Sequence, residues 1–148
     1  MQIGNYLSEN SVMFLNSNDK NEVLSSMAVQ ATKLGYISNE QEFINALIER
    51  ESIMSTDIGW EVAIPHAKLK NIPDFFVIPA VLKDSLDWGA GNDQKVRLVF
   101  LIGGPAEEQK QYLQILSKVT LIVRNKQRRK ALLEATTAAE VLAQFEGL

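Results

Sequence analysis

The chain has 148 residues, of which 46% are hydrophobic and 22% charged; disordered, collagen-like and disulfide-stapled chains have different compositions. It has no cysteine, which excludes thiolate catalysis and cysteine-ligated metal sites, and its one histidine makes a zinc site of protein ligands alone improbable on composition. The formal net charge of −3 argues against a broad nucleic-acid surface and favours a basic protein partner. We expect one globular domain over residues 1–148 that binds neither metal nor nucleic acid.

The first ten residues lack the basic and apolar regions of a signal peptide. The longest uninterrupted apolar run, 75–82, contains Pro79 and is far shorter than the roughly 20 residues that span a bilayer. These features predict a soluble, cytoplasmic protein without direct membrane insertion.

The N-terminal third predicts one short strand and two helices. Residues 12–15 are apolar and typical of a strand. A helix is expected from an N-cap at Asn18 or Asp19 to Gly35, a plausible C′ glycine. Its apolar residues recur at helical spacing: Val23, Leu24, Met27, Ala28, Ala31 and Leu34.

A capping box of Ser38 and Gln41 predicts a second helix that runs to about Arg50. We expect its buried face to carry Phe43, Ile44, Leu47 and Ile48. Residues 52–60 are polar and contain Gly59, which indicates that the helical pattern has ended.

Strand patterns dominate the middle of the chain, at 62–64, 75–78, 80–82 and 96–102. The last run is apolar at nearly every position. A strand buried on both faces, with helices above and below its sheet, explains such a pattern.

Gly103, Gly104 and Pro105 predict the turn that ends this strand. A long helix should follow as far as Asn125, with Tyr112, Leu113, Leu116, Val119 and Val123 on its buried side. After a shorter segment that carries Leu132 and Leu133, a capping box of Thr137 and Glu140 predicts a last helix that buries Val141, Leu142 and Phe145. The fold class is therefore α/β, an α-β-α sandwich with a mixed, mostly five-stranded sheet flanked by helices.

Several familiar sites are excluded by spacing, including the Walker phosphate loop, G-x-G-x-x-G, G-x-S-x-G and H-E-x-x-H. The basic cluster at 126–130 is interpreted as a solvated helix face rather than an anion site. The adjacent carboxylates of Glu107 and Glu108 fit the start of a helix and need no catalytic role.

His66 follows the short apolar run 62–64 and Pro65, which cannot extend the ladder of a central strand. We therefore expect His66 at a strand end, where ligand crevices form in α/β sheets. On position alone, a structural hydrogen-bonding role and a catalytic role remain about equally weighted.

A neutral imidazole is a competent nucleophile, and a phosphoryl substrate would need donors and positive charge around it. Arg50, Ser55, Thr56 and the backbone amides near Gly59 are the candidates for that work. Each also has an ordinary structural role. Arg50 fits a cation at a helix C-terminus, Ser55 and Thr56 fit turn residues, and Gly59 fits a position with positive φ.

Three segments together resemble one known family: Ala46–Glu51 (ALIERE), Ser55–Gly59 (STDIG) and Ala63–His66 (AIPH). They are similar, in order and at matching spacing, to the type-2 enzyme IIA domain of the phosphoenolpyruvate-dependent phosphotransferase system, the fructose/mannitol class. The segments at 87–88, 96–100 and 113–117 look like that family's later blocks, so the resemblance covers most of the chain. A stand-alone chain of this length is most similar to the nitrogen-regulatory IIA branch.

The resemblance implies a phosphotransferase component with a phosphohistidine intermediate. His66 would accept the phosphoryl group on Nε2 from HPr or a related carrier, Arg50 would steady the phosphate, and Thr56 would supply a hydroxyl beside it. No metal or organic cofactor is implied. The phosphorylation state would serve regulation or, alternatively, the phosphoryl group would pass to a IIB domain of a fructose- or mannitol-type permease.

Three positions depart from the family pattern. Asp57 and Glu61 stand where the family has glycine, and Tyr112 stands where it commonly has a second histidine. A tyrosine hydroxyl can donate to a phosphate oxygen or orient an imidazole, but it carries no positive charge. These departures favour a further alternative, a binding module that regulates its partners without being phosphorylated.

Overall fold

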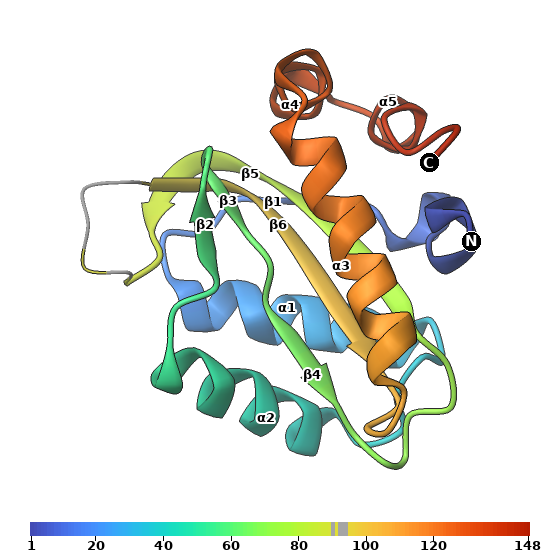
Figure 1. Ribbon diagram of the computed structural model, residues 1–148. Helices are drawn as coiled ribbons and strands as arrows, with labels where there is room; N and C mark the ends of the chain where they lie inside the picture. The colour runs from blue at the N-terminus through green and yellow to red at the C-terminus, as the bar shows by residue number, and fades with distance from the viewer. Residues whose placement is uncertain (90, 92–94) are drawn as a thin grey trace.

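The computed structural model describes residues 1–89, 91 and 95–148 (Figure 1). The strands are β1 (Met13–Leu15), β2 (Asp57–Gly59), β3 (Val62–Ala63), β4 (His66–Lys68), β5 (Phe76–Asp87) and β6 (Lys95–Gly104). The helices are α1 (Lys20–Lys33), α2 (Glu40–Ile53), α3 (Gln109–Arg124), α4 (Lys126–Glu134) and α5 (Ala138–Ala143), preceded by 3-10 turns at Ile3–Tyr6 and Glu9–Ser11. Within these residues, no helix has the length and apolarity needed to cross a membrane.

The strands form one mixed sheet in the order β1-β5-β6-β3-β2, with β4 also paired to β6. β5 and β6 are antiparallel, whereas β1 is parallel to β5, and β3 and β4 are parallel to β6. The predicted fold class is confirmed. The sheet has six strands in the described chain rather than five. The predicted runs 75–78 and 80–82 merge into the single strand β5, which continues through Pro79. The three-residue strands β2 and β4 were not predicted, because they are too short and too polar to show a strand pattern.

Helices cover both faces of the sheet: α1 and α2 lie on one side, and α3 crosses the other (Figure 1). Side chains on the two faces of β6 belong to two separate hydrophobic cores. Val99 and Leu101 pack towards α1 and α2, while Leu98, Phe100 and Ile102 pack with residues of α3, α4 and α5. The prediction that this strand is buried on both faces is therefore confirmed.

Helix α2 differs from its predicted form at both ends. Its N-cap is Asn39, whose side chain accepts a hydrogen bond from the Glu42 amide, so the predicted Ser38–Gln41 capping box is wrong. The helix continues to Ile53 instead of ending near Arg50. Apolar spacing also overestimated burial at two positions, because Ile48 and Leu113 are exposed, on α2 and α3 respectively.

The edge of the sheet that carries His66 is built along β6. β3 and β4 pair successively with the same side of β6, and Ile64 and Pro65 separate them. The Pro65 carbonyl still accepts a hydrogen bond from the Ile102 amide at 3.0 Å, so the chain stays beside β6. β3 ends before Pro65, as the sequence predicts, but His66 does not lie at the end of that strand: it is the first residue of a new edge strand, β4.

Gly104 lies where the end of β6 passes under the Phe75 ring, and a Cβ atom there would overlap ring atoms Cγ, Cδ1 and Cε1. Replacing Gly104 with alanine is expected to lower the free energy of unfolding by about 1–3 kcal/mol, the usual cost of overpacking. Urea denaturation of Gly104→Ala beside Gly4→Ala measures this, because nothing lies within 4 Å of a Cβ at Gly4. Equal stability of the two variants would contradict the packing at Gly104.

Candidate functional site

His66 lies half-buried on the edge strand β4, between α2 and α3, and both of its ring nitrogens have partners. Nδ1 lies 3.2 Å from the Ile64 carbonyl oxygen, and the Arg50 Nε–H donates to Nε2 at 3.2 Å. A carbonyl oxygen can only accept, so Nδ1 must carry the ring proton. The remaining lone pair is therefore on Nε2 and faces the guanidinium.

Arg50 stands in the last turn of α2, with its side chain fixed at two points. Its Nε donates to His66, and one terminal nitrogen donates to the Met54 carbonyl at 2.7 Å. The second bond satisfies a carbonyl just past the helix end, so the ordinary role expected of a C-terminal cation is also present. A cation held beside Nε2 is positioned to stabilise the negative charge of a group bound to that nitrogen.

Tyr112, from α3, packs its ring beside the imidazole. Its ring centroid is 5.3 Å from that of His66, and the two planes are tilted by 42°. Lys68 follows two residues after His66 on β4, and its Nζ lies 4.7 Å from the Tyr112 centroid while donating to Gln109 Oε1. The site thus has two cations, Arg50 and Lys68, around one neutral aromatic pair.

Burial lowers the pKa of the His66 imidazole from its ordinary value of 6.5, because the charged form loses hydration. The hydrogen bond to Ile64 opposes this effect, and the positive charge of Arg50 adds to it. Burial likewise raises the pKa of the Tyr112 phenol, with Arg50 opposing. At neutral pH both rings are therefore uncharged, and Nε2 keeps the lone pair of a nucleophile, which here accepts the hydrogen bond from Arg50.

The single histidine makes this pKa directly measurable. An NMR titration of the His66 ring is expected to give a midpoint below 6.5 in the native chain and near 6.5 in urea. Because the native state then binds fewer protons between the two midpoints, this group makes the free energy of unfolding rise with pH there, with its full contribution present above pH 6.5. The stability difference from His66→Gln, followed against pH, isolates that contribution. A native midpoint at or above 6.5 would contradict the described burial.

The other predicted site residues, Ser55, Thr56 and Gly59, lie in and before the hairpin of β2 and β3. The Ser55 hydroxyl accepts from the Asp57 amide at 3.2 Å, and the Gly59 amide donates to Asp57 Oδ1 at 2.8 Å. Gly59 has the expected positive φ, 86°, and the turn continues with positive φ at Trp60 and Glu61. Within the described residues, no hydrogen bond joins Ser55, Thr56 or Gly59 to the His66 ring.

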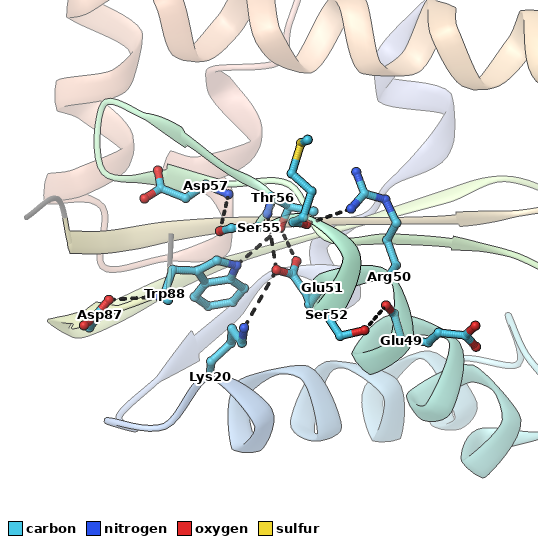
Figure 2. Close-up of polar contacts among 12 residues, drawn as sticks. Lys20, Glu49, Arg50, Glu51, Ser52, Ser55, Thr56, Asp57, Asp87 and Trp88 are labelled. Carbon is cyan, nitrogen blue, oxygen red and sulfur yellow. Dashed lines mark hydrogen bonds and ion pairs between the residues drawn. The ribbon is translucent and has the colours of Figure 1, made fainter. Parts of the chain in front are cut away.

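Thr56 is instead part of a buried polar cluster, which Figure 2 shows. Its hydroxyl donates to Glu51 Oε1, its amide donates to Glu51 Oε2 at 3.2 Å, and Trp88 Nε1 donates to its hydroxyl oxygen at 3.3 Å. Lys20 from α1 lies 4.0 Å from Glu51 Oε2. The cluster joins α1, α2, the hairpin and the end of β5.

The basic cluster of α4 has a structural explanation. In the basic cluster of α4, Arg128 donates to the Gln144 carbonyl at 2.5 Å and Arg129 to the Val123 carbonyl at 2.6 Å. Both arginines thus satisfy carbonyls near helix ends. Over residues 1–89, 91 and 95–148, no three His, Asp or Glu side chains are grouped as a metal site requires.

Sequence reasoning assigned no role at the site to Lys68, Glu51 or Trp88, although the last two lie in segments that carry the family resemblance. Lys68 could have been found once β4 was recognised, because residues two apart on a strand share a face. Glu51 carried a weaker signal, a carboxylate in the last turn of a helix, where the helix dipole favours cations. The role of Trp88 depends on its hydrogen bond to Thr56, 32 residues away along the chain, which no local pattern indicates.

Comparisons with known proteins were made for both sequence and fold. The family model described as "Phosphoenolpyruvate-dependent sugar phosphotransferase system, EIIA 2" matches residues 5–147. The chain is 33% identical over 126 residues to the fructose-specific EIIA component of Haloferax volcanii, covering 83% of this chain and 80% of that protein. It is 32% identical over 111 residues to a nitrogen regulatory protein of Bradyrhizobium diazoefficiens, covering 75% of this chain and 72% of that protein.

Another relative is much longer: the chain is 29% identical to the fructose-specific EIIABC component of Bacillus subtilis and spans only 22% of its length. Among solved structures, the nitrogen regulatory protein IIA-Ntr of Neisseria meningitidis superposes with a TM-score of 0.89 at 22% identity, over 97% of this chain and 98% of that one. The IIA mannitol protein of Escherichia coli superposes with a TM-score of 0.81 at 22% identity, over 94% and 98%. Both show the same fold.

Proposed function

The chain belongs to the EIIA type-2 family of the sugar phosphotransferase system, and from this membership we propose that it is a histidine phosphocarrier whose acceptor atom is Nε2 of His66. The observation that carries the proposal is the pairing at the ring. Nδ1 donates to the Ile64 carbonyl, which leaves the Nε2 lone pair beside Arg50. We propose that residues 1–148 make up one such domain and act in the cytoplasm.

In the proposed transfer, the Nε2 lone pair attacks the phosphorus of a phosphohistidine on an HPr-like carrier. The bond from phosphorus to the carrier's nitrogen breaks as the bond to Nε2 forms, and the carrier's imidazole leaves with the electron pair. His66 keeps its proton on Nδ1, which donates a hydrogen bond to the Ile64 carbonyl, and this bond stabilises the positive charge that the ring gains.

Arg50 and Tyr112 have different parts in this proposal. The Arg50 guanidinium, now hydrogen-bonded to Nε2, would turn its donors to the phosphoryl oxygens and stabilise their charge. Tyr112 would exclude water from one face of the ring, in the position where a second histidine is common in the family. Ser55 and Gly59 shape the adjoining hairpin. Thr56 does not contact the phosphoryl group in this proposal; its part is structural, through its hydrogen bonds to Glu51.

The proposed use of the phosphoryl group is regulatory, as the nitrogen regulatory relatives suggest. The fructose-specific relatives support a second use, transfer to a IIB domain. A solved structure similar to this chain, at 22% identity and with a TM-score of 0.84, is a complex of enzyme IIA mannitol with phosphorylated enzyme IIB mannitol from Escherichia coli.

The test is incubation with labelled phosphoenolpyruvate, enzyme I, and either HPr or its nitrogen-branch relative. The proposal predicts one acid-labile phosphoryl group per chain with at least one carrier, and addition of a purified IIB domain then separates the two uses. If the chain stays unlabelled with both carriers, the phosphocarrier role is refuted. The remaining alternative is then a binding module that regulates its partners without being phosphorylated. Tyr112→His, assayed alongside, shows whether a second imidazole changes the rate.

A further inference from the structure

Among the described residues, no hydrogen bond joins the buried Glu51 carboxylate to the His66 ring. Its negative charge nevertheless acts on that imidazole, opposing the burial that lowers the pKa of the ring, and Glu51 is the most completely enclosed charged group near the site. Its side chain is 2% exposed and accepts two hydrogen bonds from Thr56, with the Lys20 ammonium 4.0 Å away (Figure 2). Burying a carboxylate is costly unless it is well paired, and the last turn of α2 is an unfavourable place for one. The hydrogen bonds from Thr56 therefore explain why a carboxylate is tolerated at this buried position.

A continuous path of hydrogen bonds leads from Glu51 to the imidazole. Glu51 holds the amide and hydroxyl of Thr56, and the Thr56 carbonyl accepts from the Ile64 amide at 3.0 Å. The Ile64 carbonyl in turn accepts from His66 Nδ1. Ile64 is fixed by Thr56 on its amide side, and this aims its carbonyl at the ring.

Trp88 completes the hold on Thr56 from the other direction. Its indole N–H donates to the Thr56 hydroxyl oxygen, and its ring is fully buried in the core beneath α1 and α2. The Thr56 hydroxyl thus donates to Glu51 and accepts from Trp88 at the same time. Neighbouring residues of α2 therefore control opposite sides of one imidazole: Arg50 directly at Nε2, and Glu51 through Thr56 and Ile64 at Nδ1.

We propose that Glu51, with Thr56 and Trp88, is the positioning device that fixes His66 in the Nδ1–H tautomer and thereby selects Nε2 as the nucleophile. Which nitrogen carries the proton is set by the hydrogen bond at the other side of the ring. The consequence for phosphoryl transfer rests on the proposed function. The tautomer of the His66 ring, however, can be measured in the absence of any phosphoryl donor. The two can therefore be tested separately.

The test compares Glu51→Gln and Thr56→Val with the control Glu49→Gln, which neutralises an exposed glutamate on the same helix. Ring-¹⁵N-labelled histidine reports only on His66, because the chain has no other histidine. We expect both test variants to increase the Nε2–H tautomer and to slow phosphorylation about tenfold, a modest misplacement effect, with the apparent KM for the carrier unchanged. Glu49→Gln should behave as wild type.

Thr56→Ser supplies the rescue, because it keeps the hydroxyl that bonds Glu51 and Trp88. It should restore the wild-type tautomer, which a general loss of packing would not do. The proposal is overturned if folded Thr56→Val keeps the wild-type tautomer, whether or not Glu51→Gln folds. If the wild-type chain accepts no phosphoryl group but the tautomer shifts in these variants, the proposed function fails while the positioning inference stands.

Discussion

Replacing His66 with glutamine is expected to abolish the incorporation of acid-labile phosphate. The glutamine amide nitrogen has no available lone pair, since it is delocalised into the carbonyl, so it cannot replace Nε2 as nucleophile. The chain has no other histidine and no cysteine, so neither a second imidazole nor a thiolate can take the place of His66. The measurement is the amount of labelled phosphate per chain after incubation with phosphoenolpyruvate, enzyme I and the carrier. We expect no labelled phosphate on His66→Gln.

The control for this variant must show that the fold and the carrier are intact. His66 is half-buried on an edge strand, so glutamine fits with little repacking, and a thermal unfolding curve close to that of the wild type is expected. The carrier should be labelled to its usual extent in the same reaction. Retention of acid-labile phosphate in His66→Gln would show that the acceptor is elsewhere.

Replacing Arg50 with alanine is expected to slow phosphorylation by a factor on the order of 10²–10³, the usual effect of removing one donor that stabilises developing charge. Arg50 Nε lies 3.2 Å from the nitrogen that would form the new bond. The loss should fall on the rate of transfer at saturating carrier, because the contact strengthens as charge develops. Rapid-quench kinetics over a range of carrier concentrations separate this rate from carrier affinity.

Arg50→Lys and Arg124→Ala are the matched variants. Lysine keeps the charge but loses the planar fork of donors, so it should recover only part of the rate. Arg124→Ala removes an exposed arginine from the last turn of α3 and should leave the rate unchanged. A wild-type rate in Arg50→Ala would remove Arg50 from the mechanism.

The sequence predicted those helices and strands whose own buried faces produce a recognisable pattern of apolar residues. The run 96–102 is apolar on both faces because helices cover both sides of β6, and the helix from Asp19 to Gly35 has its N-cap and C′ glycine where expected. β2 and β4 could not be predicted in this way. Each has three residues, and their pairing depends on β3 and β6 rather than on their own composition.

The site was predicted unevenly for a similar reason. The single histidine and Pro65 directed attention to His66, and the resemblance supplied Arg50. The roles of Glu51 and Trp88 depend on contacts with Thr56, and Trp88 is 32 residues away along the chain, so no local pattern indicates it. The resemblance also implied a phosphate-side hydroxyl for Thr56, whereas its hydroxyl here donates to Glu51.

The most direct test of the account is to find where the phosphoryl group is attached in the wild-type chain. Ring-¹⁵N-labelled protein, phosphorylated through enzyme I and the carrier, gives nitrogen signals from His66 alone, and phosphorus coupling identifies the bonded nitrogen. The account predicts one phosphoryl group per chain, bonded to Nε2, with the proton still on Nδ1. A phosphoryl group on Nδ1, on another residue, or on none with either carrier would contradict it.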